Sequence, residues 1–206
     1  MRKIGLFCGT FNPIHSGHRL IAECARDQCG LDKVFFITSP SPPHRQDQDL
    51  LDARARHEMV LAAIADNPNF EASTVEIDRD GLSYTIETVE YFQELHPKSK
   101  VYLIIGGDNV QYLRDWHRSE DLFEKCHFLV APRLVSSSIG LDITEVRMEV
   151  DRKCLEWRGS RMSIIDFPGI AISASYIRNR IKEKQSVLYM VPTAVNKILE
   201  EKGYYR

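Results

Sequence analysis

Short apolar runs alternate with amphipathic stretches along the 206 residues of this chain, and this alternation restricts the possible folds most strongly. Because strands and helices that alternate in this way form a parallel sheet with right-handed crossovers, the sequence predicts an α/β fold. We expect a Rossmann-like doubly wound parallel sheet with a small C-terminal helical portion. Ligands bind to such sheets beyond the carboxyl ends of the strands, where the strand order reverses.

Local patterns predict the individual elements. Strands are expected at residues 3–7, at 34–38, around Val75 and Ile77, and at 101–105, 128–131 and 164–167. Helices are expected from about Gly17 to Cys29, from Asp52 to Asp66, from Ser83 toward Leu95, from about Ser173, and from Pro192 to just before Gly203. Residues 134–162 show no clear period, so no element is predicted there.

Length and composition fit a single domain over residues 1–206, with about 172–206 as its C-terminal helical subregion. Charged residues make up 27% of the chain but the net charge is only −2, so no global field favours nucleic acid. No apolar run reaches the roughly 18 residues of a membrane span, and Met-Arg-Lys leads directly into a strand instead of a signal peptide. We therefore expect a cytoplasmic protein that binds neither nucleic acid nor membrane. The sequence does not determine the oligomeric state, and a homo-oligomer is one of the possibilities.

The segment from Cys8 to His18 has the chemistry of a phosphate-binding turn between the first strand and the first helix. His15 and His18 are three residues apart, which places both imidazoles on one side of the first helical turn. The backbone N–H groups and the positive end of the helix dipole point the same way. Gly9 and Gly17 allow the backbone to approach a ligand closely.

Three other polar segments follow predicted strands or open helices, and each also has a plain structural explanation as a turn or a cap. Pro42-Pro43-His44-Arg45 is a stiff loop that would present two polar side chains. Gly106-Gly107-Asp108 follows a strongly apolar strand. Ser173, Ser175 and Arg178 form a helix start that suits an anion.

The sequence His15-Ser-Gly-His18 resembles the H-x-G-H signature of nucleotidylyltransferases, which join a nucleotide to a phosphate-bearing acceptor and release pyrophosphate. The resemblance is closest to the nicotinate mononucleotide adenylyltransferases. Four further features carry it: Ser83-Tyr84-Thr85, Trp116, the Pro-Pro-His loop and the Ile172-to-Arg178 segment. It covers most of the chain except about residues 134–162. Two positions depart from the bacterial pattern. Cys8 is present where the bacterial pattern has Gly, and Asn12 where it has Asp. Asn at the second position resembles the eukaryotic branch of the family.

The resemblance implies roles for particular residues. ATP binding is expected from Gly9, Thr10, Phe11, His15, His18, Gly106, Asp108, Ser173, Ser175 and Arg178, with His15, His18 and Arg178 catalytic. Substrate binding is expected from Asn12, His44, Arg45, Ser83, Tyr84, Thr85 and Trp116, with the nicotinate carboxylate at the Ser-Tyr-Thr helix start and the ring on Trp116. Mg²⁺ would be held mainly by ATP phosphates and water, so no metal ligands are expected from the protein.

The acceptor phosphate is already ionised, so the expected catalysis is alignment and charge stabilisation without a protein nucleophile. The expected reaction joins ATP and nicotinate mononucleotide to give deamido-NAD and pyrophosphate. A nicotinamide mononucleotide adenylyltransferase that forms NAD directly is the nearest alternative, and a non-catalytic nucleotide-binding regulator is the alternative from another class.

Overall fold

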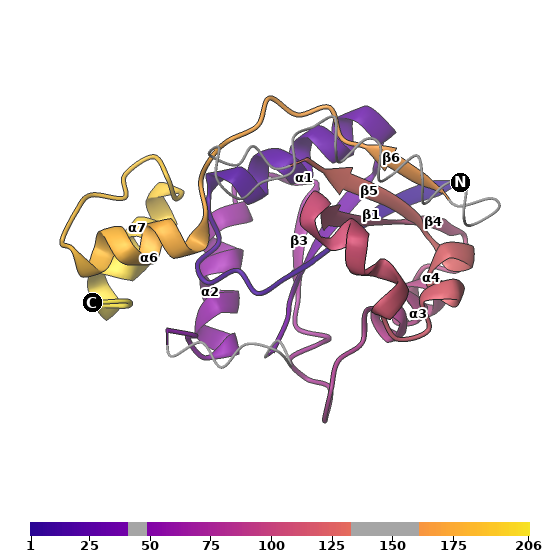
Figure 1. Ribbon diagram of the computed structural model, residues 1–206, viewed down its shortest axis with the longest axis horizontal. Helices are drawn as coiled ribbons and strands as arrows, with labels where there is room; N and C mark the ends of the chain where they lie inside the picture. Colours follow the sequence, from indigo (N-terminus) through magenta and orange to yellow (C-terminus); the bar gives the residue numbers. More distant parts are fainter. Residues whose placement is uncertain (41–48, 133–160) are drawn as a thin grey trace. The chain divides into compact units, whose positions relative to one another are not determined.

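The computed structural model describes residues 1–40, 49–132 and 161–206. Its strands are β1 (Arg2–Gly9), β2 (Lys33–Thr38), β3 (Phe70–Ser73), β4 (Ser99–Gly106), β5 (His127–Ala131) and β6 (Met162–Ile164). Its helices are α1 (Ser16–Cys29), α2 (Ala53–Ile64), α3 (Thr85–Leu95), the 3₁₀ helix η1 (Gly107–Asp115), α4 (Ser119–Lys125), α6 (Ala174–Lys182) and α7 (Thr193–Lys202), shown in Figure 1. No helix within these ranges is long and apolar enough to cross a membrane.

The six strands form one sheet in the order β3-β2-β1-β4-β5-β6. The pairs β1–β4, β4–β5 and β5–β6 are parallel, with Ile4 opposite Val101 and Val130 opposite Ile164. This is the strand order of the doubly wound dinucleotide-binding folds, in which the order reverses between β1 and β4. The predicted Rossmann-like α/β fold is therefore confirmed.

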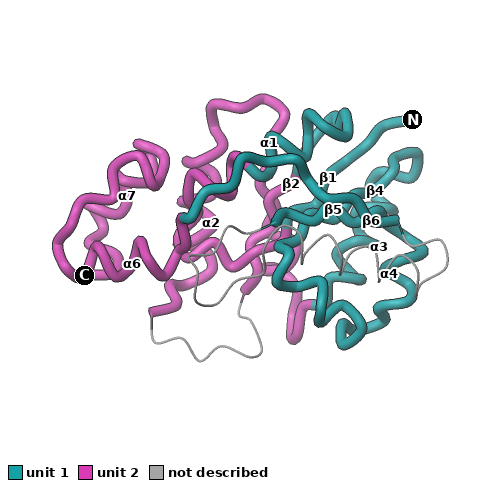
Figure 2. The backbone as a smooth tube through the Cα atoms, turned by 45° about the horizontal axis from the view of Figure 1, so that its top comes forward, with its two compact units in different colours: residues 1–7, 21–34, 84–171 teal, residues 8–20, 35–83, 172–206 magenta. Residues whose placement is uncertain are grey.

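The contacts within the chain divide it into two compact units, coloured separately in Figure 2. Unit 1 comprises Met1–Phe7, Ile21–Val34 and Tyr84–Ala171, and unit 2 comprises Cys8–Leu20, Phe35–Ser83 and Ile172–Arg206. Each unit is discontinuous in sequence, because the chain changes units inside β1 and again inside β2. The single domain expected from the sequence stays a prediction.

The core of unit 1 is built on β4 and β5. Side chains at successive positions of both strands are buried, as expected for strands that are covered on both faces. Helix α3 packs on α4 and β4, while η1 contacts β4 and β5. The buried residues of the two strands are Val101, Leu103, Ile104, Ile105, Phe128, Leu129, Val130 and Ala131.

The core of unit 2 lies on helix α2. Its inward face is apolar, because Met59, Val60, Ala63 and Ile64 recur with the spacing of one helix face, and all four are buried. Helix α2 contacts β3 and the C-terminal helix α7, and the latter lies beside it in Figure 1. The C-terminal helices are thus part of unit 2.

Several predicted helix ends are confirmed by their capping groups. The Asp52 carboxylate accepts hydrogen bonds from the N–H groups of Arg54 and Ala55 and begins α2. Ser173 accepts from the N–H of Tyr176 at the start of α6. Helix α7 begins after Pro192 and ends at Gly203, whose φ of 65° is typical of a helix terminator.

One predicted strand and two predicted boundaries are wrong. Val75 and Ile77 lie in a turn instead of a strand. The turn is closed by two hydrogen bonds, from the N–H of Asp78 to the Thr74 carbonyl and from the Thr74 hydroxyl to the Asp78 carboxylate. Helix α3 begins at Thr85 with Tyr84 as its N-cap, so Ser83 lies outside it. The last strand is Met162–Ile164 and not 164–167, although the N–H of Ile165 still donates to the Val130 carbonyl.

Candidate active site

The turn between β1 and α1 brings the two expected imidazoles together in unit 2. The rings of His15 and His18 stack with their centroids 3.7 Å apart. The edge of Phe11 meets His18 at a centroid distance of 5.1 Å. His15 is buried and His18 is half-buried, so the pair forms one packed aromatic group at the start of the helix.

A backbone contact determines the proton position on His18. The N–H of His15 donates to Nδ1 of His18 over 3.2 Å. A nitrogen that accepts a hydrogen bond carries no proton, so the neutral ring holds its proton on Nε2. His18 therefore presents an N–H donor of the kind that binds a phosphate oxygen.

The two glycines of the turn make room for the chain's own rings. A Cβ atom on Gly9 would lie 2.9 Å from the Phe11 ring, and a Cβ atom on Gly17 would lie 3.1 Å from the His15 ring. Such contacts are tighter than normal van der Waals packing. Gly9 and Gly17 thus leave the space that the rings of Phe11 and His15 occupy.

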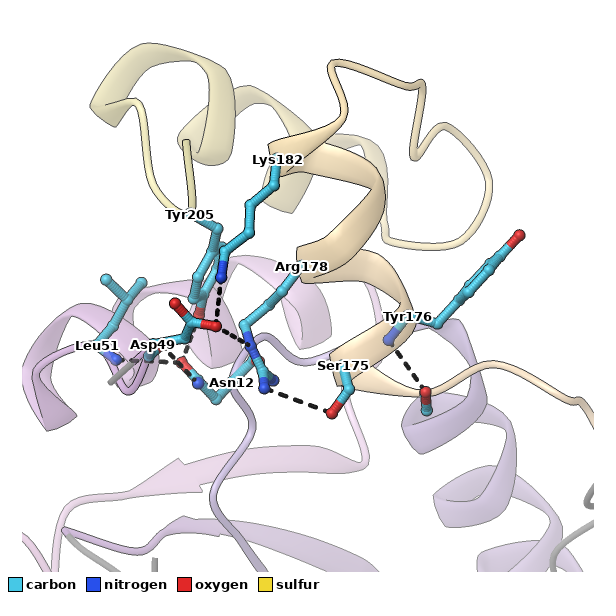
Figure 3. Close-up of polar contacts among 9 residues, drawn as sticks. Asn12, Asp49, Leu51, Ser175, Tyr176, Arg178, Lys182 and Tyr205 are labelled. Atoms are coloured by element: carbon cyan, nitrogen blue, oxygen red, sulfur yellow. Dashed lines mark hydrogen bonds and ion pairs between the residues drawn. The ribbon is translucent and has the colours of Figure 1, made fainter. Parts of the chain in front are cut away.

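Helix α6 supplies the buried guanidinium of Arg178. Its Nη1 donates to the backbone carbonyl of Asn12 over 2.9 Å, and its Nη2 lies 3.4 Å from the Ser175 hydroxyl (Figure 3). The side chain is 7% exposed. This contact joins α6 to the β1–α1 turn. Two predicted ATP-binding segments, the one with His15 and the one with Ser175 and Arg178, therefore occur in unit 2.

Asn12 is held from four directions. Its Nδ2 donates to the carbonyl of Asp49, and its Oδ1 accepts from the N–H of Leu51 and, at 2.6 Å, from the Tyr205 hydroxyl. Its backbone carbonyl accepts from Arg178. The side chain is 4% exposed, and Figure 3 shows it at the centre of these contacts. Asn12 thus has a clear positioning role, and its expected contact with the substrate stays a prediction.

Arg56 is a structural residue of the site that no motif indicated. It is fully buried on α2, and its guanidinium donates to the backbone carbonyls of Thr10, Ser39, Pro40 and Leu51. Burial lowers the pKa of Arg56 from its ordinary value, yet guanidinium groups remain charged at neutral pH. Arg56 therefore fixes the turn after β1 and the exit from β2 with one planar group.

The expected pyridine-binding residues Tyr84, Thr85 and Trp116 lie in unit 1. The N–H of Tyr84 approaches the Glu87 carboxylate at 3.4 Å at the start of α3. The Tyr84 ring also meets His117, the residue after Trp116, at a centroid distance of 4.2 Å. Trp116 is half-buried at the end of η1, in agreement with its position between charged neighbours. Tyr84 and Trp116 are thus brought into one region of this unit.

The remaining predicted residues are distributed as follows. Ser83 belongs to unit 2, where its hydroxyl accepts from Arg79 over 2.7 Å. Gly106 ends β4 in unit 1, and Asp108 folds back so that its Oδ1 lies 2.5 Å from where a Cβ on Gly106 would be. Asp108 itself is exposed. His44 and Arg45 lie outside the described residues.

Comparison with known proteins identifies the class first. Residues 6–180 match the family described as cytidylyltransferase-like. A protein of Moorella thermoacetica named "Probable nicotinate-nucleotide adenylyltransferase" is 39% identical over 206 residues, which cover 99% of this chain and 92% of that protein. The Bacillus subtilis protein named "Nicotinate-nucleotide adenylyltransferase" is 35% identical, covering 100% of this chain and 99% of its own. The chain therefore belongs to the cytidylyltransferase-like family and, within it, to the nicotinate-nucleotide adenylyltransferases.

The fold has a close structural counterpart. The Plasmodium falciparum nicotinic acid mononucleotide adenylyltransferase, solved in complex with NaAD, superposes with a TM-score of 0.76 at 16% identity. The match covers 100% of this chain and 98% of that one. At this identity the similarity establishes the fold, and the sequence relatives establish the family.

Proposed function

We propose that this chain transfers the adenylyl group of ATP to nicotinate mononucleotide, which yields deamido-NAD and pyrophosphate, a step of NAD biosynthesis. The observation that carries the proposal is the stacked His15–His18 pair, whose backbone contact leaves an Nε2–H donor on His18. The names of the relatives and the NaAD complex of the structural neighbour support the same chemistry.

In the proposed reaction an oxygen of the acceptor phosphate attacks the α-phosphorus of ATP. The new O–P bond forms as the bond from the α-phosphorus to the bridging oxygen breaks, and that oxygen leaves with pyrophosphate. The acceptor oxygen is already an anion, so the protein has to align the groups and stabilise their charge. His18 donates through Nε2, His15 packs on it, and Arg178 contributes a buried positive charge.

The other residues contribute contacts to the two substrates. We assign Gly9, Thr10, Phe11, Gly106, Asp108, Ser173 and Ser175 to ATP, and Ser83, Tyr84, Thr85, Trp116, His44 and Arg45 to the mononucleotide. We assign Asn12 to the mononucleotide as well, and the two hydrogen bonds that its side-chain oxygen accepts within the protein hold the turn in place. The cytoplasmic location and the oligomeric state stay predictions.

Mg²⁺ enters this scheme with ATP, as part of the substrate. The described residues contain no group of three or more His, Cys, Asp or Glu side chains that could hold a metal ion. Mg²⁺ commonly keeps several waters and binds through substrate phosphates. Bound to ATP, the ion would neutralise phosphate charge, while the protein supplies the hydrogen-bond donors.

One assay tests the reaction and its acceptor together: pyrophosphate release from ATP with each pyridine mononucleotide separately. Helix-start donors suit a carboxylate, whereas a carboxamide also needs an acceptor for its NH₂ group. We expect nicotinate mononucleotide to be preferred at least about tenfold in kcat/KM. Equal or better efficiency with nicotinamide mononucleotide would reverse the acceptor preference. Release with neither compound would leave the nucleotide-binding regulator as the better interpretation.

A further inference from the structure

Lys182, at the exposed end of helix α6, is a second cationic residue on the same face of the helix as Arg178. Ser175, Arg178 and Lys182 are three and four residues apart, so they follow one another along one side of the helix. Figure 3 shows the two cationic side chains extending toward the same carboxylate. Arg178 is buried, whereas the Lys182 side chain is 44% exposed. Lys182 was not among the residues that the sequence motifs indicated.

That carboxylate belongs to Asp49. Its Oδ2 lies 2.6 Å from Nζ of Lys182 and 4.0 Å from Nε of Arg178. The backbone of Asp49 is anchored, because its carbonyl accepts from Nδ2 of Asn12 over 3.0 Å. The pKa of Asp49 is lowered, mainly by the hydrogen bond from Lys182. The two cations of α6 thus already have an anionic oxygen from the protein beside them.

Asp49 is poorly suited to be the support that orients Arg178. Two other groups hold the guanidinium at shorter distances, the Asn12 carbonyl at 2.9 Å and the Ser175 hydroxyl at 3.4 Å. The Asp49 side chain is also 34% exposed, so it lies on the accessible side of this cluster. Removal of the carboxylate would leave both of those hydrogen bonds in place.

We propose that Lys182 is a further phosphate-binding residue, and that Asp49 occupies the position of a phosphate oxygen on Arg178 and Lys182 when no nucleotide is bound. The inference rests on the proposed function, because it assumes that Arg178 binds ATP. Carboxylate and phosphate oxygens bind the same cationic groups, and two anions at one place repel each other. ATP therefore has to displace Asp49, and Asp49 sets the affinity for the phosphates without contacting the adenosine.

The test is calorimetric titration of the full chain with ATP and, separately, with adenosine. Because exposed ion pairs are weak, Asp49→Asn should bind ATP about twofold to fivefold more tightly. Lys182→Gln should bind ATP more weakly by a similar factor. Both variants should bind adenosine as the unchanged chain does, since only phosphates compete with Asp49.

Two matched variants control for net charge. Asp66→Asn removes a carboxylate that pairs with Arg19 at 2.6 Å, and Lys197→Gln removes an ammonium 3.7 Å from Glu201. Neither should change the ATP affinity by more than the measurement error. Equal or weaker ATP binding by Asp49→Asn, or unchanged binding by Lys182→Gln, would overturn this inference alone. If the unchanged chain binds no ATP, the proposed function fails and the inference fails with it.

Discussion

His18 depends on one backbone contact for its chemical role. The N–H of His15 occupies Nδ1, and this leaves the proton on Nε2, where it can meet a phosphate oxygen. The stacked ring of His15 limits the tilt of the imidazole. A donor that is already oriented costs little reorganisation when negative charge develops on the phosphates.

Replacement of His18 should therefore reduce turnover with little effect on the fold. His18→Ala removes the donor, and the loss of such a contact costs about 3 kcal/mol, or about a hundredfold in kcat. His18→Gln keeps an amide N–H near the position of Nε2 and should retain more activity than His18→Ala. Initial rates and circular dichroism of both variants are the measurements. A kcat close to that of the unchanged chain in His18→Ala would contradict the role.

His57 makes a different, pH-dependent contribution. It is 9% exposed on α2, and its Nδ1 lies 3.2 Å from the Thr38 hydroxyl. Burial, followed by the charge of Arg54, lowers the pKa of His57 below its ordinary value. The folded chain thus binds this proton less readily than the unfolded chain does.

The sign of the resulting pH dependence follows from that difference. The contribution of His57 to stability is fully present above the unfolded pKa of about 6.5 and is lost as the pH falls toward the lower folded pKa. We expect the free energy of unfolding to decrease between about pH 6.5 and pH 5. The decrease should be smaller in His57→Gln, as measured by urea denaturation at each pH. An equally steep decrease in that variant would assign the effect to other groups.

At the scale of elements, the sequence predicts correctly where local chemistry decides the structure. Asp52 and Ser173 cap helices through their own side chains, and Gly203 ends α7 because it takes a left-handed φ. The same local reasoning fails at Val75 and Ile77. Their alternation with acidic residues indicates a strand, but the hydrogen bonds between Thr74 and Asp78 close a turn there.

The candidate site was predictable in its motifs but not in its support. The motifs identified His15, His18 and Arg178, since those residue types suit phosphate wherever the chain places them. The contact of Arg178 with the Asn12 carbonyl joins residues 166 positions apart, and no local pattern encodes it. Arg56 sits in an ordinary amphipathic helix, so nothing in its sequence context indicates that it binds four backbone carbonyls.

The hydrogen bond between Tyr205 and Asn12 ties the C-terminus to the β1–α1 turn. Tyr205 is 8% exposed, and its hydroxyl donates to Asn12 Oδ1 over 2.6 Å. Tyr205→Phe should lower the free energy of unfolding by about 1 kcal/mol, because one buried hydrogen bond is lost and the Leu51 N–H still partly satisfies the oxygen. Urea denaturation should show a lower midpoint with an unchanged slope.

Tyr204→Phe is the matched control for that measurement. The Tyr204 side chain is half-buried, and its hydroxyl makes no hydrogen bond to any residue that the structure describes. We expect its midpoint to stay within error of the unchanged chain. Equal effects of the two substitutions would mean that the Tyr205 hydroxyl adds nothing specific.

At the scale of the whole molecule, the chain crosses between its two units within continuous strands. Residues 2–7 of β1 belong to unit 1 and residues 8–9 to unit 2, and β2 changes units between Val34 and Phe35. Helix α1 also begins in unit 2 and ends in unit 1. Neither unit is therefore a segment that can be cut out of the chain at a linker, which is how separate domains are usually joined.

We expect the 206 residues to unfold in one cooperative transition. If either unit unfolded alone, β1, β2 and α1 would each have to break within the element. Backbone N–H and C=O groups next to each break would then lose their hydrogen-bond partners. Differential scanning calorimetry should then give a calorimetric enthalpy of about 140 kcal/mol near 60 °C, equal to the van't Hoff enthalpy. Two units that unfold independently would instead give a van't Hoff enthalpy of about half that value, and this outcome would contradict the single domain expected from the sequence.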